Sequence, residues 1–182
     1  MNPFYLIPIA AILILFIVDG VVRKKAFSHV QHLYDQHRTD ELLGYLNSRY
    51  ARLLFPVFNR SNMQFKAFAQ AGQTEKACDK LQELLNMKAT DEQRSALLAS
   101  AFEFYLSNDM GKEAKEMLGL IGQARGSEEA VIELTKLYDI KINHSSAYLA
   151  EMEQELPFSD DATRRRLQFL IKLQKENRSA AN

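Results

Sequence analysis

Apolar residues recur at intervals of three and four positions along the chain after residue 25, and strand-like alternation of apolar and polar residues is absent. This periodicity predicts amphipathic helices and an all-α fold class. The expected helices lie near residues 26–37, 40–54, 59–71, 75–87, 91–108, 112–123, 128–141, 145–155 and 160–177. The short connections between them predict a run of antiparallel hairpins.

Capping and turn residues mark the ends of these helices. Thr90 and Gln93 have the spacing of a capping box, in which each side chain binds the backbone N–H of the other residue. Hydroxyl residues followed by acids mark further starts, at Thr39, Thr74, Ser127 and Ser159. Stops are indicated by residues such as Pro56 and Gly72.

The beginning of the chain has a different pattern. Residues 3–22 are apolar apart from Asp19, and Arg23, Lys24 and Lys25 follow directly. At a rise of ~1.5 Å per residue, a helix of this length covers the ~30 Å hydrocarbon core of a bilayer. The pattern predicts a transmembrane signal anchor over residues 1–25, with residues 3–22 in the membrane.

The basic cluster after the apolar run sets the expected topology. By the positive-inside rule, the cluster and everything after it face the cytoplasm, and the amino terminus lies outside. We therefore expect a single-pass membrane protein. A cleaved secretory signal is the competing interpretation, but the chain lacks the basic start and the small-x-small cleavage site that such a signal needs. Arg23, Lys24 and Lys25 are also candidates for a secondary contact with anionic lipid.

Three of the expected hairpins share one plan. A shift of 37 positions places Phe65 on Phe102, Phe68 on Tyr105, Ala77 on Ala114, Leu81 on Leu118 and Leu84 on Ile121. A shift of 33 positions places Tyr105 on Tyr138 and Ala114 on Ala147. The small alanine lets the second helix approach the aromatic residue on the first helix, because a large side chain there would wedge the pair apart.

In the first of these hairpins, Phe68, Gly72, Ala77 and Leu81 have the spacing of a tetratricopeptide motif. Over residues 58–156 the chain resembles a degenerate member of the tetratricopeptide-repeat (TPR) family, without the tryptophan of the family motif. The resemblance implies a TPR-like α-hairpin solenoid. A generic helical bundle is the alternative, because short hairpins produce similar patterns.

The predicted fold class is thus all-α, with one N-terminal transmembrane helix followed by a TPR-like α-hairpin solenoid. Its segments are 1–25 (anchor with basic flank), 26–57 (juxtamembrane helical hairpin), 58–156 (TPR-like repeats) and 157–182 (C-terminal capping helix and tail). The part after the anchor has the length of one domain. In the last helix Leu167, Leu170, Ile171 and Gln174 have core spacing, which suits a helix that closes the stack.

The charges and reactive residues exclude several classes of function. The chain has 23 basic and 23 acidic residues, so no overall positive field favours nucleic acid as a partner. Cys78 is the single cysteine, which rules out an internal disulfide. His29, His32 and Asp35 are the best candidates for a metal site, but such spacing arises readily by chance in a polar helix. No phosphate loop or catalytic motif is present, and we expect no cofactor, no metal and no enzymatic activity.

The resemblance implies an interaction protein. In the TPR family the binding groove is lined by the first helix of each hairpin, and the matching positions here are Asn62, Lys66, Gln70, Glu103 and Lys136. We expect these residues to contact a partner protein, and we expect the chain to be a membrane-anchored cytoplasmic scaffold. A structural subunit of a membrane complex, held by its transmembrane helix, is the alternative. A membrane-bound enzyme or a metal-binding protein is less favoured.

Overall fold

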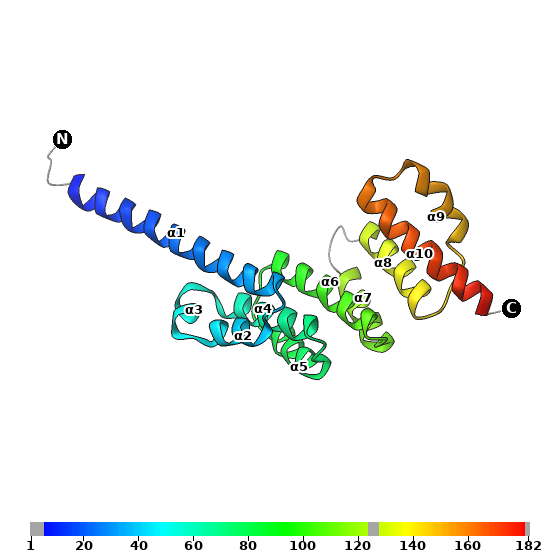
Figure 1. Cartoon of the computed structure of the whole chain (residues 1–182), viewed down its shortest axis with the longest axis horizontal. Helices are drawn as coiled ribbons and strands as arrows, with labels where there is room; N and C mark the ends of the chain where they lie inside the picture. Colours follow the sequence, from blue (N-terminus) through cyan, green and yellow to red (C-terminus); the bar gives the residue numbers. More distant parts are fainter. Residues whose placement is uncertain (1–5, 124–127, 181–182) are drawn as a thin grey trace. The chain divides into compact units, whose positions relative to one another are not determined.

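The computed structural model describes residues 6–123 and 128–180, with side chains from Asp19 onward within these ranges. These residues form α-helices, one 3-10 helix and no strand, which confirms the all-helical prediction (Figure 1). The elements are α1 (Leu6–Asp35), α2 (Thr39–Asn47), α3 (Arg49–Leu54), α4 (Val57–Gln70), α5 (Thr74–Leu85), α6 (Asp91–Ser107), α7 (Gly111–Gly122), α8 (Glu128–Lys141), α9 (Leu149–Glu155), η2 (Leu156–Phe158) and α10 (Asp161–Ala180).

The predicted transmembrane anchor is contradicted. Across the part of the chain that the structure describes, no helix combines the length and the apolar character that crossing a bilayer requires. The described side chains of α1 include charged groups at Asp19, Arg23, Lys24 and Lys25, and charged side chains are costly in the hydrocarbon core. Residues 3–5 of the predicted span, and the side chains of residues 6–18, lie outside what the structure describes. The same finding contradicts the predicted single-pass topology.

The chain divides into two compact units, residues 1–89 and residues 90–182, where the length of the chain predicted one domain. In the first unit, α1 and α2 form a hairpin, α2 packs against α4, and α4 forms a second hairpin with α5. Part of the core of this unit is a cluster of buried residues that includes Val30, Leu33, Leu42 and Leu46. The predicted single helix over 40–54 is interrupted at Ser48, whose hydroxyl accepts a hydrogen bond from the N–H of Ala51 and caps α3.

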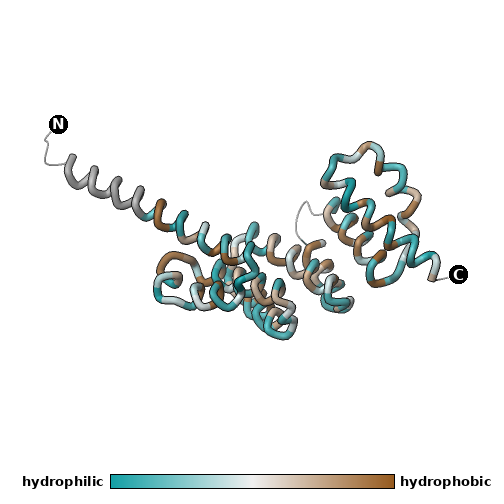
Figure 2. The backbone as a smooth tube through the Cα atoms, viewed as in Figure 1, coloured by the Kyte–Doolittle hydropathy of each residue, from teal (hydrophilic) through white to brown (hydrophobic). Residues whose placement is uncertain are grey.

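In the second unit, α6 and α7 form a hairpin, α7 packs against α8, and α8 and α9 both pack against α10. Hydrophobic and hydrophilic residues both occur along each of these helices (Figure 2). The buried residues of α10 are Leu167, Leu170, Ile171 and Gln174, as the spacing predicted. Gln174 is a buried polar residue, and its side-chain oxygen accepts a hydrogen bond from the N–H of Tyr148 at 3.1 Å. This bond ties α10 to the start of α9.

Three hairpin turns have the same backbone conformation. His37, Gly72 and Asp109 adopt left-handed φ values of 56°, 68° and 56°. The next residues have nearly identical angles: φ and ψ are −84° and 63° at Arg38, −83° and 65° at Gln73, and −87° and 69° at Met110. In each turn the N–H of that next residue donates to the carbonyl five positions earlier, on Leu33, Phe68 and Tyr105, at 3.0, 3.0 and 2.9 Å. This is the 6→1 bond of a Schellman motif, so α1/α2, α4/α5 and α6/α7 are three copies of one hairpin.

The burial pattern repeats with the turns. Counted from the left-handed residue, the fifth following position is Leu42, Ala77 or Ala114, and each of these is buried. The seventh preceding position is Val30, Phe65 or Phe102, again all buried. The repeat therefore begins in α1, upstream of the predicted residue 58. The predicted third copy in α8/α9 differs, since Ala147 is exposed and lies before α9 begins.

Two glycines near these turns have different roles. Gly72 is the left-handed residue of its turn, and Asp109 occupies that place in the α6/α7 turn. Gly111 lies two residues later, at the start of α7, and a Cβ atom built there would be 2.8 Å from the side chain of Ile142. Gly111 is therefore needed for the close approach between α7 and the end of α8.

The Gly72→Ala variant is expected to lower the free energy of unfolding by about 1 kcal/mol, because a Cβ is disfavoured at positive φ. A Cβ at this position would meet no atom within 4 Å, so the change tests the backbone conformation alone. The control is Gly72→Asn, which should lose less because asparagine tolerates the left-handed region. Chemical denaturation measures both. Equal stability of the alanine variant and the wild type would contradict the assigned turn.

Candidate functional site: a groove between helices α1 and α4

A groove of about 400 Å³ lies between the first helices of two successive hairpins in the first unit. Because α2 packs against both α1 and α4, its Leu42 forms part of the floor, together with Val30, Phe55 and Met63. The remaining lining residues are Phe27, Gln31, Tyr34, Asn59, Asn62 and Lys66. The groove thus combines an apolar floor with amide groups and one cation, a composition typical of sites that bind organic ligands and peptides.

Asn62, one of the residues that line this groove, carries an unpaired polar atom. Its side-chain oxygen is buried, and no hydrogen-bond donor contacts it within the described part of the chain. A buried carbonyl oxygen without a donor costs about 1 to 3 kcal/mol, so most such groups in proteins are paired. Because the oxygen is buried, a ligand in the groove could remove this cost only after the Asn62 side chain rotates toward the groove. Four positions along the same helix, Lys66 is exposed, and it takes part in none of the ion pairs formed by the described residues.

The residues that the sequence predicted as one partner-binding set belong to both units. Asn62 and Lys66 line the groove, whereas Gln70, on the same helix, is half-buried and is not among the lining residues. Glu103 is exposed on α6, and Lys136 lies on α8, so both belong to the second unit.

Lys136 forms two ion pairs and is one of the residues that line a hollow of about 250 Å³ between α8, α9 and α10. Its ammonium group is 2.8 Å from the carboxylate of Glu151 on α9 and 3.1 Å from that of Glu133 on α8. These hydrogen bonds, that to Glu151 first, raise the pKa of Lys136 above its ordinary value. The side chain is 19% exposed. The expectation that Lys136 is exposed is therefore wrong, and the ion pair to Glu151 links α8 to α9. Its contact with a partner protein stays a prediction.

Reversing this charge is expected to destabilise the second unit. Lys136→Glu would place a carboxylate between Glu133 and Glu151, and the loss of two partly exposed ion pairs should cost about 1 kcal/mol. Adding Glu151→Lys to that variant restores one opposite pair and should recover part of the loss. A double-mutant cycle measured by thermal unfolding tests this coupling. Strict additivity of the two changes would show that the pair contributes nothing.

The candidate metal ligands have other contacts. The ring of His29 packs edge-on against Tyr45, with centroids 4.9 Å apart. Asp35 accepts a hydrogen bond from the side chain of Gln31 at 2.8 Å. Within the described ranges, no group of three or more histidine, cysteine or acidic side chains is placed to hold a metal ion. Cys78 is half-buried in α5.

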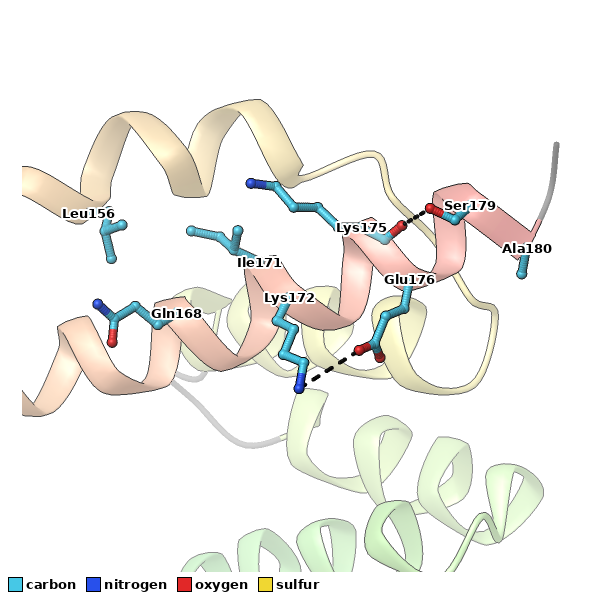
Figure 3. Close-up of a pocket in the computed structure, with 8 residues that line it drawn as sticks. All are labelled: Leu156, Gln168, Ile171, Lys172, Lys175, Glu176, Ser179 and Ala180. Carbon is cyan, nitrogen blue, oxygen red and sulfur yellow. Dashed lines mark hydrogen bonds and ion pairs between the residues drawn. The ribbon is translucent and has the colours of Figure 1, made fainter.

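A second hollow runs along α10 in the second unit (Figure 3). All of its lining residues except Leu156 belong to α10. Its charged groups are already engaged, since Lys172 pairs with Glu176 at 3.9 Å and Lys175 pairs with Glu153 at 2.7 Å. A hollow formed by one face of one helix encloses little of a ligand, and the groove in the first unit is therefore the stronger candidate.

The sequence missed the α1 side of the groove, namely Phe27, Gln31 and Tyr34. A signal was present, because a shift of 35 positions places His37 on Gly72, Leu46 on Leu81 and Gln31 on Lys66. Comparison of the chain with protein-family profiles, curated proteins and solved structures finds no match. The function of the groove is therefore inferred from the residues that line it.

Proposed function

We propose that this protein is a helical-repeat binding module that holds an extended segment of a partner protein in the groove between α1 and α4. The observation that carries the proposal is the buried, unpaired carbonyl oxygen of Asn62 beside an apolar floor. An extended peptide has a backbone N–H at each residue except proline. One of these can pair with the Asn62 oxygen once the side chain rotates toward the groove, while an apolar side chain rests on the floor. The three copies of one hairpin and the resemblance to the TPR family support the same function.

The charge at the rim defines the expected partner sequence. Lys66 is exposed and outside the ion pairs of the described residues, so an acidic residue of the peptide beside Lys66 would gain a favourable electrostatic interaction. We expect the bound segment to carry an apolar residue with an aspartate or glutamate close to it. The proposed binding does not require a transmembrane helix.

Selection from a random peptide-display library on the full-length protein tests this function. Enriched peptides should combine an apolar residue with a nearby acid, and Lys66→Glu should weaken their binding roughly 3- to 10-fold. Glu103→Lys is the matched control, because Glu103 is exposed but lies outside the groove. Failure to enrich any peptide, or enriched peptides that bind the Lys66 variant as well as the wild type, would contradict the proposal.

A further inference from the structure

Apolar side chains are exposed on and around the short helix α3. Leu53 is 80% exposed, and Tyr50 and Val57 are also exposed, as is Val21 on α1. Leaving aliphatic groups in water is unfavourable, so a cluster of them on one segment indicates a contact surface. We call Val21, Tyr50, Leu53 and Val57, together with the cations described next, the α3 surface.

Basic residues lie close to these apolar residues along the sequence of α3 and α1. Arg49 and Arg52 are exposed on α3, and Arg23, Lys24 and Lys25 are exposed on α1. The two helices are joined, because the guanidinium of Arg23 donates to the backbone carbonyl of Leu54 at 2.7 Å. Arg23 also pairs with Asp19, whereas Lys24, Lys25, Arg49 and Arg52 take part in none of the ion pairs of the described residues.

The opposite end of the α1/α2 hairpin has the reverse charge. Because α2 runs antiparallel to α1, the turn at His37 lies at one end of the hairpin and α3 lies at the other. The turn end carries the acidic residues Asp35, Asp40 and Glu41, and one cation, Arg38, which pairs with Glu41. The positive charge is therefore concentrated where the aliphatic side chains are exposed, although the whole chain has no net charge.

We propose that the α3 surface docks on an anionic lipid surface, with Leu53 among the acyl chains and the cations at the headgroups. Basic residues attract anionic headgroups, and aliphatic residues next to them gain from entering the interface. A nucleic acid would use the cations but offers no place for Leu53. This contact is peripheral, requires no membrane-spanning helix, and is independent of the groove.

A fluorescent probe at position 53 tests the proposal in the full-length protein. The variant Leu53→Cys, in a Cys78→Ser background, would carry an environment-sensitive nitrobenzoxadiazole label. Mixing with phosphatidylcholine vesicles that contain phosphatidylserine should shift the emission to the blue and raise its intensity. Vesicles of phosphatidylcholine alone should leave the emission at position 53 unchanged, because the contact depends on negative headgroups.

Two experiments test the role of the basic residues. Arg49→Glu with Arg52→Glu should weaken the vesicle affinity reported at position 53 by about 30-fold or more. Added salt should weaken it in the labelled protein without these substitutions, which tests the charge even if the double variant folds poorly. An unchanged affinity under added salt, or in a folded double variant, would overturn the proposal.

The second unit supplies a matched control site. Phe169 is an exposed apolar residue on α10, and the exposed Arg165 and Arg166 precede it on the same helix. The same label at Phe169→Cys should show no shift with anionic vesicles. Equal shifts at both positions, or equal shifts at position 53 with neutral vesicles, would overturn the proposal. A shift at position 53 with an oligonucleotide matching that with anionic vesicles would identify a general polyanion site and also overturn it.

Discussion

Replacing Ala114 by phenylalanine is expected to lower the free energy of unfolding by about 1 to 3 kcal/mol, the usual cost of overpacking. Ala114 is completely buried in α7, which packs against α6. It occupies the same place after its turn as Ala77 does, and the close packing of α7 against α6 leaves no room there for a ring. Thermal and chemical unfolding of the variant measure the effect.

The control for this variant is Ala99→Phe, because Ala99 is an exposed alanine on α6. Substitutions at exposed helical positions usually change stability by less than about 0.5 kcal/mol. A melting temperature of the Ala114 variant equal to that of the wild type would show that the assigned hairpin register is wrong.

Replacing Asn62 by leucine is expected to have opposite effects on stability and on binding. The two side chains branch at the same carbon and have the same number of heavy atoms. Leucine removes the buried oxygen that lacks a donor, so the free energy of unfolding should rise by up to about 1 to 3 kcal/mol. Peptide affinity should fall roughly 3- to 10-fold, because the hydrogen bond from the peptide backbone is lost. A more stable protein that binds less well is the signature of a polar group kept for function.

The Gln70→Leu variant distinguishes binding in the groove between α1 and α4 from binding at the residues that the sequence predicted. Gln70 lies on α4 with Asn62 but does not line the groove, so the variant should leave peptide affinity unchanged. Calorimetric unfolding and binding titrations with one selected peptide give both quantities. If Asn62→Leu lowers stability and leaves affinity unaltered, the unpaired oxygen has no role in binding, and the groove assignment fails.

Features of the chain that depend on near neighbours were predictable. The capping box of Thr90 and Gln93 is formed as the spacing predicted, with hydrogen bonds of 3.1 and 3.2 Å. Ser159 was predicted to cap the last helix, but the carboxylate of Asp160 accepts the hydrogen bonds from Ala162 and Thr163 instead. Choosing between adjacent capping residues depends on where the preceding helix ends, and here η2 continues to Phe158.

The first copy of the hairpin was not predicted from the sequence because of the residue at its turn. The repeat was predicted from the glycine at position 72, Gly72. A histidine or an aspartate at the equivalent position does not by itself predict a left-handed conformation. His37 and Asp109 nevertheless adopt that conformation, because the Schellman hydrogen bonds and the packed helices on either side hold the turn. The apolar N-terminal residues also predicted a membrane anchor, which the described residues contradict.

By itself, the sequence determined the all-helical class, most helix limits after residue 56 and the buried face of α10, because these follow from interactions between residues three or four positions apart. Only the tertiary structure decided which polar residues are available for binding. Lys136 and Lys66 are alike in sequence, but Lys136 meets Glu151 from another helix, whereas Lys66 borders a groove whose other wall is α1. The groove and the ion pair both arise from residues brought together by the packing of hairpins, and helical periodicity carries no information about such contacts.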